Sequence, residues 1–132
     1  AEHLRRIFQH ATGNSKILDV CCSYGRTAHW WDDRNYVGFD FVPEFVEEAK
    51  KRHPGKTFLV ANVTEPLPFR DKQFNIAILI SVKKVIEPVV GGEMWGAVEK
   101  ELKRVAKKVL ILEYGMSRPK DIEESFEILC AD

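Results

Sequence analysis

Four polar residues stand at or near the carboxyl ends of four short apolar runs. They are Asp19, Asp40, Asn62 and Ser81. If these runs are parallel strands of one sheet, their carboxyl ends share an edge, and two carboxylates, an amide and a hydroxyl converge on one crevice. Each residue also has a structural explanation, since acids and amides often cap helices, and Asp40 could cap a helix that begins at Pro43. Recurrence at four equivalent places favours a binding site.

The stretch ILDVCCSYGRTA joins the first apolar run to a loop of small residues, in which Cys21, Ser23 and Gly25 alternate with larger ones. Small side chains allow a ligand to approach the backbone closely. Gly25 can take a positive φ or seat the following helix against the strand. The loop therefore has the composition of a nucleotide-binding turn.

Asp40 and Asn62 indicate an adenosine ligand. An acid about twenty residues after the first strand suits a ribose diol, and an amide offers a donor and an acceptor to an adenine edge. The dinucleotide motif G-x-G-x-x-G is absent, because only Gly25 is a glycine. Asp19 would repel a pyrophosphate but accept a hydrogen bond from an ammonium group. These features favour S-adenosylmethionine, a cationic adenosine cofactor, over NAD.

Apolar runs alternating with longer periodic segments predict the elements that position these residues. The expected strands are 16–21, 36–41, 56–62, 74–81 and 108–114. The expected helices are 25–33, 43–52, 93–106 and 119–131, with 82–92 as a loop. The expected inward-facing helix residues are Phe45, Val46, Ala49, Met94, Trp95, Val98, Leu102 and Val105. The order predicts a single α/β domain over residues 1–132, with a doubly wound, mostly parallel sheet of about five strands and helices on both faces.

The ordered set of motifs resembles class I S-adenosylmethionine-dependent methyltransferases. KILDVCCSYGR resembles their motif I, in which an acid precedes a loop of the form D-x-G-x-G-x-G. YVGFDFVPEFVEEAKKR is similar to their second strand, ribose-binding acid and following helix. FLVANVTEPLPFRDKQFNIAIL resembles the adenine-site segment and fourth strand, and ELKRVAKKVLILEY the helix and strand after it. The resemblance covers residues 15–114 and implies a Rossmann-like methyltransferase.

The resemblance implies a set of cofactor-binding residues. They are Asp19, Cys21, Ser23, Gly25, Asp40, Phe41, Asn62, Val63 and Ser81. The small loop residues would line the methionine moiety and ribose. Asp40 would bind the ribose hydroxyls, with Phe41 beside the adenine. Asn62 and the Val63 backbone would address the adenine edge, and Ser81 would lie near the transferable methyl.

Two departures from the family pattern stand out. Cys21 and Ser23 replace the first two loop glycines, which we expect to weaken binding modestly. The family sheet has seven strands and ends in a hairpin, whereas five are expected here. The exposed sheet edge would then need covering by the last helix or by a partner chain.

Composition excludes several classes. Lysine plus arginine equals aspartate plus glutamate, so the zero net charge argues against nucleic-acid binding. No window reaches the ~18 apolar residues of a membrane span, and the first residues lack the apolar stretch of a signal peptide. Three cysteines, two of them adjacent, form no sensible disulfide framework and indicate a reducing cytoplasm.

Other reactive side chains have simpler explanations. The adjacent cysteines at 21–22 lack the spacing of a metal site, so no metal is expected. The tryptophans at 30–31 are expected to cover the sheet edge rather than stack a substrate. His29 and His53 are expected to be solvated. The lysines at 83–84 are expected in a solvated loop, although they could favour an acidic substrate.

The leading hypothesis is an S-adenosylmethionine-dependent methyltransferase acting on an unidentified small molecule or protein. The sequence identifies no general base. One alternative is a non-catalytic, cofactor- or partner-binding member, as part of a homo-oligomer or beside another subunit. A second alternative is an NAD-linked oxidoreductase, which the loop and Asp19 disfavour.

Overall fold

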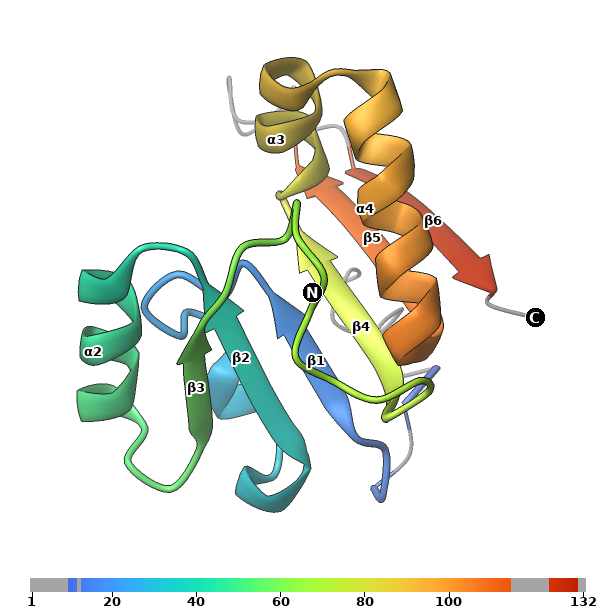
Figure 1. Ribbon diagram of the computed structural model, residues 1–132. Coiled ribbons are helices and arrows are strands. Elements are labelled where there is room, and N and C mark those ends of the chain that lie inside the picture. The colour runs from blue at the N-terminus through green and yellow to red at the C-terminus, as the bar shows by residue number, and fades with distance from the viewer. Residues whose placement is uncertain (1–9, 12, 115–123, 131–132) are drawn as a thin grey trace.

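The fold of the chain is given by a computed structural model that describes residues 10–11, 13–114 and 124–130. Its centre is a six-stranded sheet in the order β3-β2-β1-β4-β5-β6 (Figure 1). The strands are β1 Ile17–Val20, β2 Tyr36–Asp40, β3 Thr57–Val60, β4 Phe74–Ile80, β5 Ala106–Tyr114 and β6 Glu124–Cys130. The first five are parallel, and β6 is antiparallel to β5. The strands β2 and β3 lie on one side of β1, and β4 and β5 lie on the other side. This order confirms the doubly wound topology.

Both faces of the sheet are buried. On β4, Ala77 and Leu79 belong to one core, while Ile76, Ile78 and Ile80 belong to the other. The helix α4 (Gly92–Val105) covers the first face, and α2 (Pro43–Arg52) covers part of the second (Figure 1). Burial on both sides explains why the central strands are almost continuously apolar.

The two best-marked helices confirm most of the predicted inward faces. Val46 and Ala49 of α2 are buried, as are four predicted residues of α4. The prediction is wrong for Phe45 and Met94, which are 42% and 41% exposed. Each lies one residue before a buried neighbour, a rotation of about 100° that turns it away from the core.

Three segments differ from prediction. The expected helix 25–33 contains a single 3-10 turn, Ala28–Trp30, and a second turn follows at Asp33–Asn35. Trp31 between them is extended and buried in the core. The expected loop 82–92 contains the helix α3 (Lys83–Val90).

The third difference is at the carboxyl end. Part of the expected helix 119–131 lies outside the described residues, and 124–130 is the strand β6. ESFEILC also fits a two-residue alternation, and pairing with β5 decides in favour of the strand. Because β6 pairs along β5 from Lys108 to Tyr114, β5 is not the exposed edge that was predicted.

The segment between β3 and β4 is fastened to α4. Arg104 of α4 donates to the backbone oxygens of Leu67 and Phe69, at 3.1 and 2.9 Å, and to the Asp71 carboxylate at 2.9 Å. Glu101 accepts from Arg104 and from the Leu67 backbone N–H. These contacts hold the segment that carries Asn62 and Val63 across the sheet face (Figure 1).

Replacing Arg104 should loosen this segment. Arg104→Ala removes the guanidinium hydrogen bonds to the Leu67 and Phe69 oxygens and to Asp71, so we expect a thermal midpoint several degrees lower in a melt followed by circular dichroism. Lys100→Ala, an exposed position of the same helix, is the control and should leave the midpoint unchanged. Equal melting midpoints of the two variants would show that the Arg104 hydrogen bonds do not stabilise the domain.

Candidate functional site

A hollow of about 330 Å³ opens at the carboxyl edge of the sheet. Its lining is Cys21, Phe41, Ala61, Asn62, Val63, Thr64, Val85, Ile86, Val89 and Val90. Four of the nine predicted site residues are therefore brought together, from the loops after β1, β2 and β3. The lining is mostly apolar, and the Phe41 side chain is 65% exposed at its rim. Such a ring offers a flat face for stacking.

Asp40 joins the loops that surround this hollow. Its Oδ2 accepts from the Ser23 backbone N–H at 2.9 Å, and its Oδ1 accepts from the Val42 N–H at 3.1 Å. The Asp40 backbone oxygen accepts from Ala61. The carboxylate is 6% exposed. The Asp40 carboxylate therefore accepts the hydrogen bond of a backbone N–H at the start of α2, and it also fixes the loop after β1.

The loop after β1 has an unusual backbone. Cys21, Ser23 and Gly25 have φ of 54°, 55° and 81°, in the left-handed region that favours glycine. The loop has positive φ at each of the three glycine positions of motif I, although two of them hold other residues. Side chains in this region cost of order 1 kcal/mol each. Cys21 and Ser23, in place of two glycines, therefore strain the backbone of this loop.

Asp19 is buried in β1, where it accepts two hydrogen bonds that the sequence did not predict. Its Oδ2 accepts from the Tyr36 hydroxyl at 2.5 Å and from the Thr27 hydroxyl at 3.3 Å. Burial raises the pKa of Asp19 to about 6, against the lowering effect of these two hydrogen bonds. A second, small hollow of about 10 Å³ is lined by Asp19, Cys21, Arg26 and Thr27, among others. Cys21 borders both hollows.

Four predicted site residues line neither hollow: Ser23, Gly25, Asp40 and Ser81. Gly25 is followed by a 3-10 turn and not by the expected helix, and it packs against the end of α2. A Cβ there would meet the His53 ring at 2.9 Å, and the His53 Nε2 lies 3.0 Å from the Gly25 oxygen. His53 is therefore half-buried and hydrogen-bonded, not solvated as predicted. Ser81 directly follows β4 with φ 57°, and its N–H donates to the Leu112 backbone oxygen.

A family model described as "Methyltransferase domain" matches residues 17–108, more than half of the chain. The chain belongs to this family. No curated protein sequence matches it. The family assignment agrees with the resemblance drawn from the motifs.

Solved structures share the fold of this methyltransferase domain. An S-adenosylmethionine-dependent methyltransferase of Methanosarcina mazei is 21% identical, with a TM-score of 0.72, over 83% of this chain and 57% of that one. A protein of Pyrococcus horikoshii is 24% identical, with a TM-score of 0.69, over 86% and 56%. A TehB-like S-adenosylmethionine-dependent methyltransferase of Corynebacterium glutamicum is 20% identical, with a TM-score of 0.65, over 82% and 59%. The chain thus spans less than two thirds of each structure.

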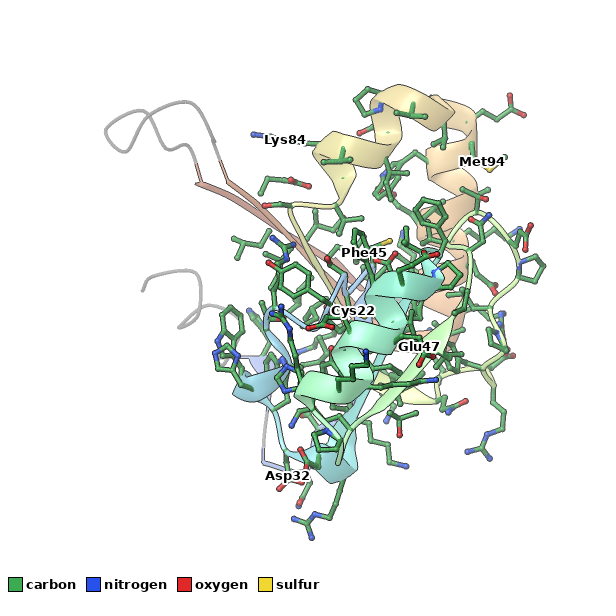
Figure 2. The ribbon with its side chains drawn as sticks, turned by 90° about the vertical axis from the view of Figure 1, so that its left-hand side faces the viewer. Cys22, Asp32, Phe45, Glu47, Lys84 and Met94 are labelled. Atoms are coloured by element: carbon green, nitrogen blue, oxygen red, sulfur yellow. The ribbon has the colours of Figure 1, made fainter. Side chains whose placement is uncertain are left out.

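Other side chains of the methyltransferase domain have structural roles. Cys22 is buried between the sheet and α2 (Figure 2), and Trp31 is buried in the same core. A hollow of about 500 Å³ beside Trp30 lies at the opposite, amino-terminal edge of the sheet, away from every predicted site residue.

The described residues contain no group of three or more His, Cys, Asp or Glu that could hold a metal ion. Within the same residues, no helix has the length and apolarity of a membrane span.

Restoring glycine to the strained loop should stabilise the domain. Ser23→Gly removes the left-handed strain, and part of the gain is offset by the greater freedom of glycine in the unfolded chain. We expect the free energy of unfolding in urea to rise by about 0.5–1 kcal/mol. Ser23→Ala keeps the Cβ and should give no such gain. Equal stabilities of the two variants would contradict the strain.

Asp19→Asn should remove a pH dependence of stability. The folded pKa is about 6, and the unfolded value is near 3.8. Between these values the folded protein retains a proton that the unfolded chain has lost, so wild-type stability falls as pH rises from 4 to 6. The loss is on the order of 3 kcal/mol above pH 6. Relative to wild type, Asp19→Asn should therefore gain stability between pH 4 and 7 in urea unfolding. The exposed control Glu44→Gln should show no such gain, and a pH-independent difference for Asp19→Asn would contradict the burial effect.

Proposed function

We propose that this domain binds S-adenosylmethionine and transfers its methyl group to an acceptor molecule. The observation that carries the proposal is the convergence of three strand-end loops and the helix α3 (Lys83–Val90) of a methyltransferase domain on one hollow, which carries an exposed aromatic ring and an amide. S-adenosylmethionine supplies a methyl group already activated by a positive sulfur. The protein then has to align the donor with the acceptor and exclude water.

The hollow fits the adenosine part of this cofactor. Phe41 and the apolar side chains offer stacking and packing surfaces. The Asn62 Oδ1 accepts from the Thr64 N–H and hydroxyl, at 2.9 and 2.7 Å, so its amide nitrogen is the group left to address a ligand. Asp40 lies directly before Phe41 but is 6% exposed and lines neither hollow, so a ribose hydroxyl would reach its carboxylate only if the loop after β1 opened. These features support an adenosine site.

The amino-acid part of the cofactor matches the small hollow in charge. Asp19 and Arg26 both line it, one suited to an ammonium group and the other to a carboxylate. Sequence analysis missed Arg26, although it directly follows the loop. A volume of about 10 Å³ has room for scarcely one water molecule, so binding would require the loop of residues 21–27 to open.

The remaining expectations are proposals. We infer a reducing, cytoplasmic setting from the free Cys21 and Cys22. A partner subunit or a second copy on a sheet edge remains a prediction. The partner would now meet β3 or β6, the two strands at the ends of the sheet.

Isothermal titration with S-adenosylhomocysteine, the demethylated cofactor, tests the proposal. We expect saturable binding to the wild type and none of NAD. Asp40→Ala should weaken binding at least about tenfold, through loss of a charged hydrogen-bond acceptor. Asn62→Ala, at an exposed position, keeps the test valid if Asp40→Ala does not fold. Asp33→Asn, at the opposite edge of the sheet, is the control. No heat with the wild type at millimolar ligand would refute the proposed function.

A further inference from the structure

Three carboxylates are buried in the described part of the chain, those of Asp19, Asp40 and Glu113. They belong to β1, β2 and β5, near the carboxyl ends of these strands, at the edge that holds the hollow. The proposed cofactor site accounts for the first two. Glu113 is 4% exposed, and no role has yet been given to it. A carboxylate is costly to bury, so its contacts indicate what it does.

Glu113 faces the first turn of α3. Its Oε1 accepts from the Lys84 backbone N–H at 3.3 Å. The Lys84 side chain projects outward (Figure 2), and its hydrogen bond to Glu113 comes from the helix backbone. The buried Oε2 has no hydrogen-bond partner among the residues that the structure describes. Glu113 therefore acts as an N-terminal cap supplied by another strand.

The helix α3 depends on such external support. It has eight residues, none of them buried, and Pro88 lies inside it. Val82, at the N-cap position, gives no side-chain hydrogen bond. A helix this short is not stable by itself, and an internal proline removes a further hydrogen bond. A carboxylate at the amino end supplies the missing acceptor and opposes the positive end of the helix dipole.

The same helix forms one wall of the hollow. Val85, Ile86, Val89 and Val90 line it across from Phe41. Ile86 and Val90 pack against the core, while Val85 and Val89 are 66% and 83% exposed. Figure 1 shows α3 above the carboxyl ends of β4 and β5. A ligand in the hollow would cover apolar surface that α3 now exposes to water.

We propose that Glu113 is a positioning residue of the cofactor site: it fixes the first turn of α3, which packs fully only against an adenosine ligand in the hollow. The inference rests on the proposed function. By thermodynamic linkage, a ligand that gains contacts from the ordered helix also stabilises that helix. Removing Glu113 must then weaken the binding of the ligand, although Glu113 itself does not line the hollow.

Hydrogen exchange of the α3 amides, with and without saturating S-adenosylhomocysteine, tests this role. In the wild type, the ligand should slow exchange at the amides of residues 85–87 and 89–90 by about tenfold or more. Glu113→Ala should lose this protection and raise the dissociation constant about tenfold, the effect of one charged hydrogen bond. Glu113→Gln keeps a carbonyl acceptor and should fall between the two. Glu93→Gln, an exposed acid in the first turn of α4, is the control and should match the wild type.

The outcomes separate the two proposals. If the wild type binds S-adenosylhomocysteine but α3 exchanges at an unchanged rate, the positioning role is overturned and the proposed function stands. Wild-type affinity in both Glu113 variants would overturn it as well. If Glu113→Ala does not fold, the wild-type exchange and the Glu113→Gln affinity decide the question. If the wild type does not bind the ligand at all, the proposed function fails first.

Discussion

The arrangement of the candidate site depends on one buried carboxylate. Asp40 accepts from the backbone of Ser23 in the loop after β1 and from Val42 at the entry to α2. Its own backbone oxygen receives the N–H of Ala61, after β3. Three segments that are distant in sequence thus meet at one residue. Helix entry and ligand site were competing explanations of this aspartate; the structure shows the contact at the helix entry, and the ligand role stays a prediction.

The loop after β1 shows how a family conformation persists without its usual residues. Cys21 and Ser23 hold the left-handed backbone that glycine adopts without strain. Asp40 and the buried core around Cys22 hold the chain in this conformation from both sides. Strain of this kind is typical of functional sites, where the surrounding structure determines the backbone. The spacing of the motif is therefore a better guide to this loop than its residue types.

Sequence patterns predicted the elements whose signals are local. The apolar run of β4 is buried on both faces, and Pro43 with the charge order of α2 marks a helix without reference to its neighbours. Prediction failed where distant partners decide. The β-branched residues and Pro88 disfavour α3, which is supported by Glu113 and by packing on the core.

The same distinction applies to the site. That Asp40 and Asn62 lie near one another followed from the strand order alone, since parallel strands share an edge. The Tyr36 hydroxyl on Asp19, and the His53 ring on Gly25, could not be predicted because each joins side chains of separate elements. Beta-strand pairing likewise decided β6, for which the sequence pattern suited either a helix or a strand.

The position of Cys21 has a consequence for chemical selectivity. Its thiol borders the hollow, and burial, together with the nearby carboxylates of Asp40 and Asp19, raises its pKa to about 12. Only the thiolate form of cysteine is a strong nucleophile. At neutral pH the side chain is uncharged and a weak nucleophile, so it would not capture the alkyl group of the electrophilic donor that we propose for this hollow.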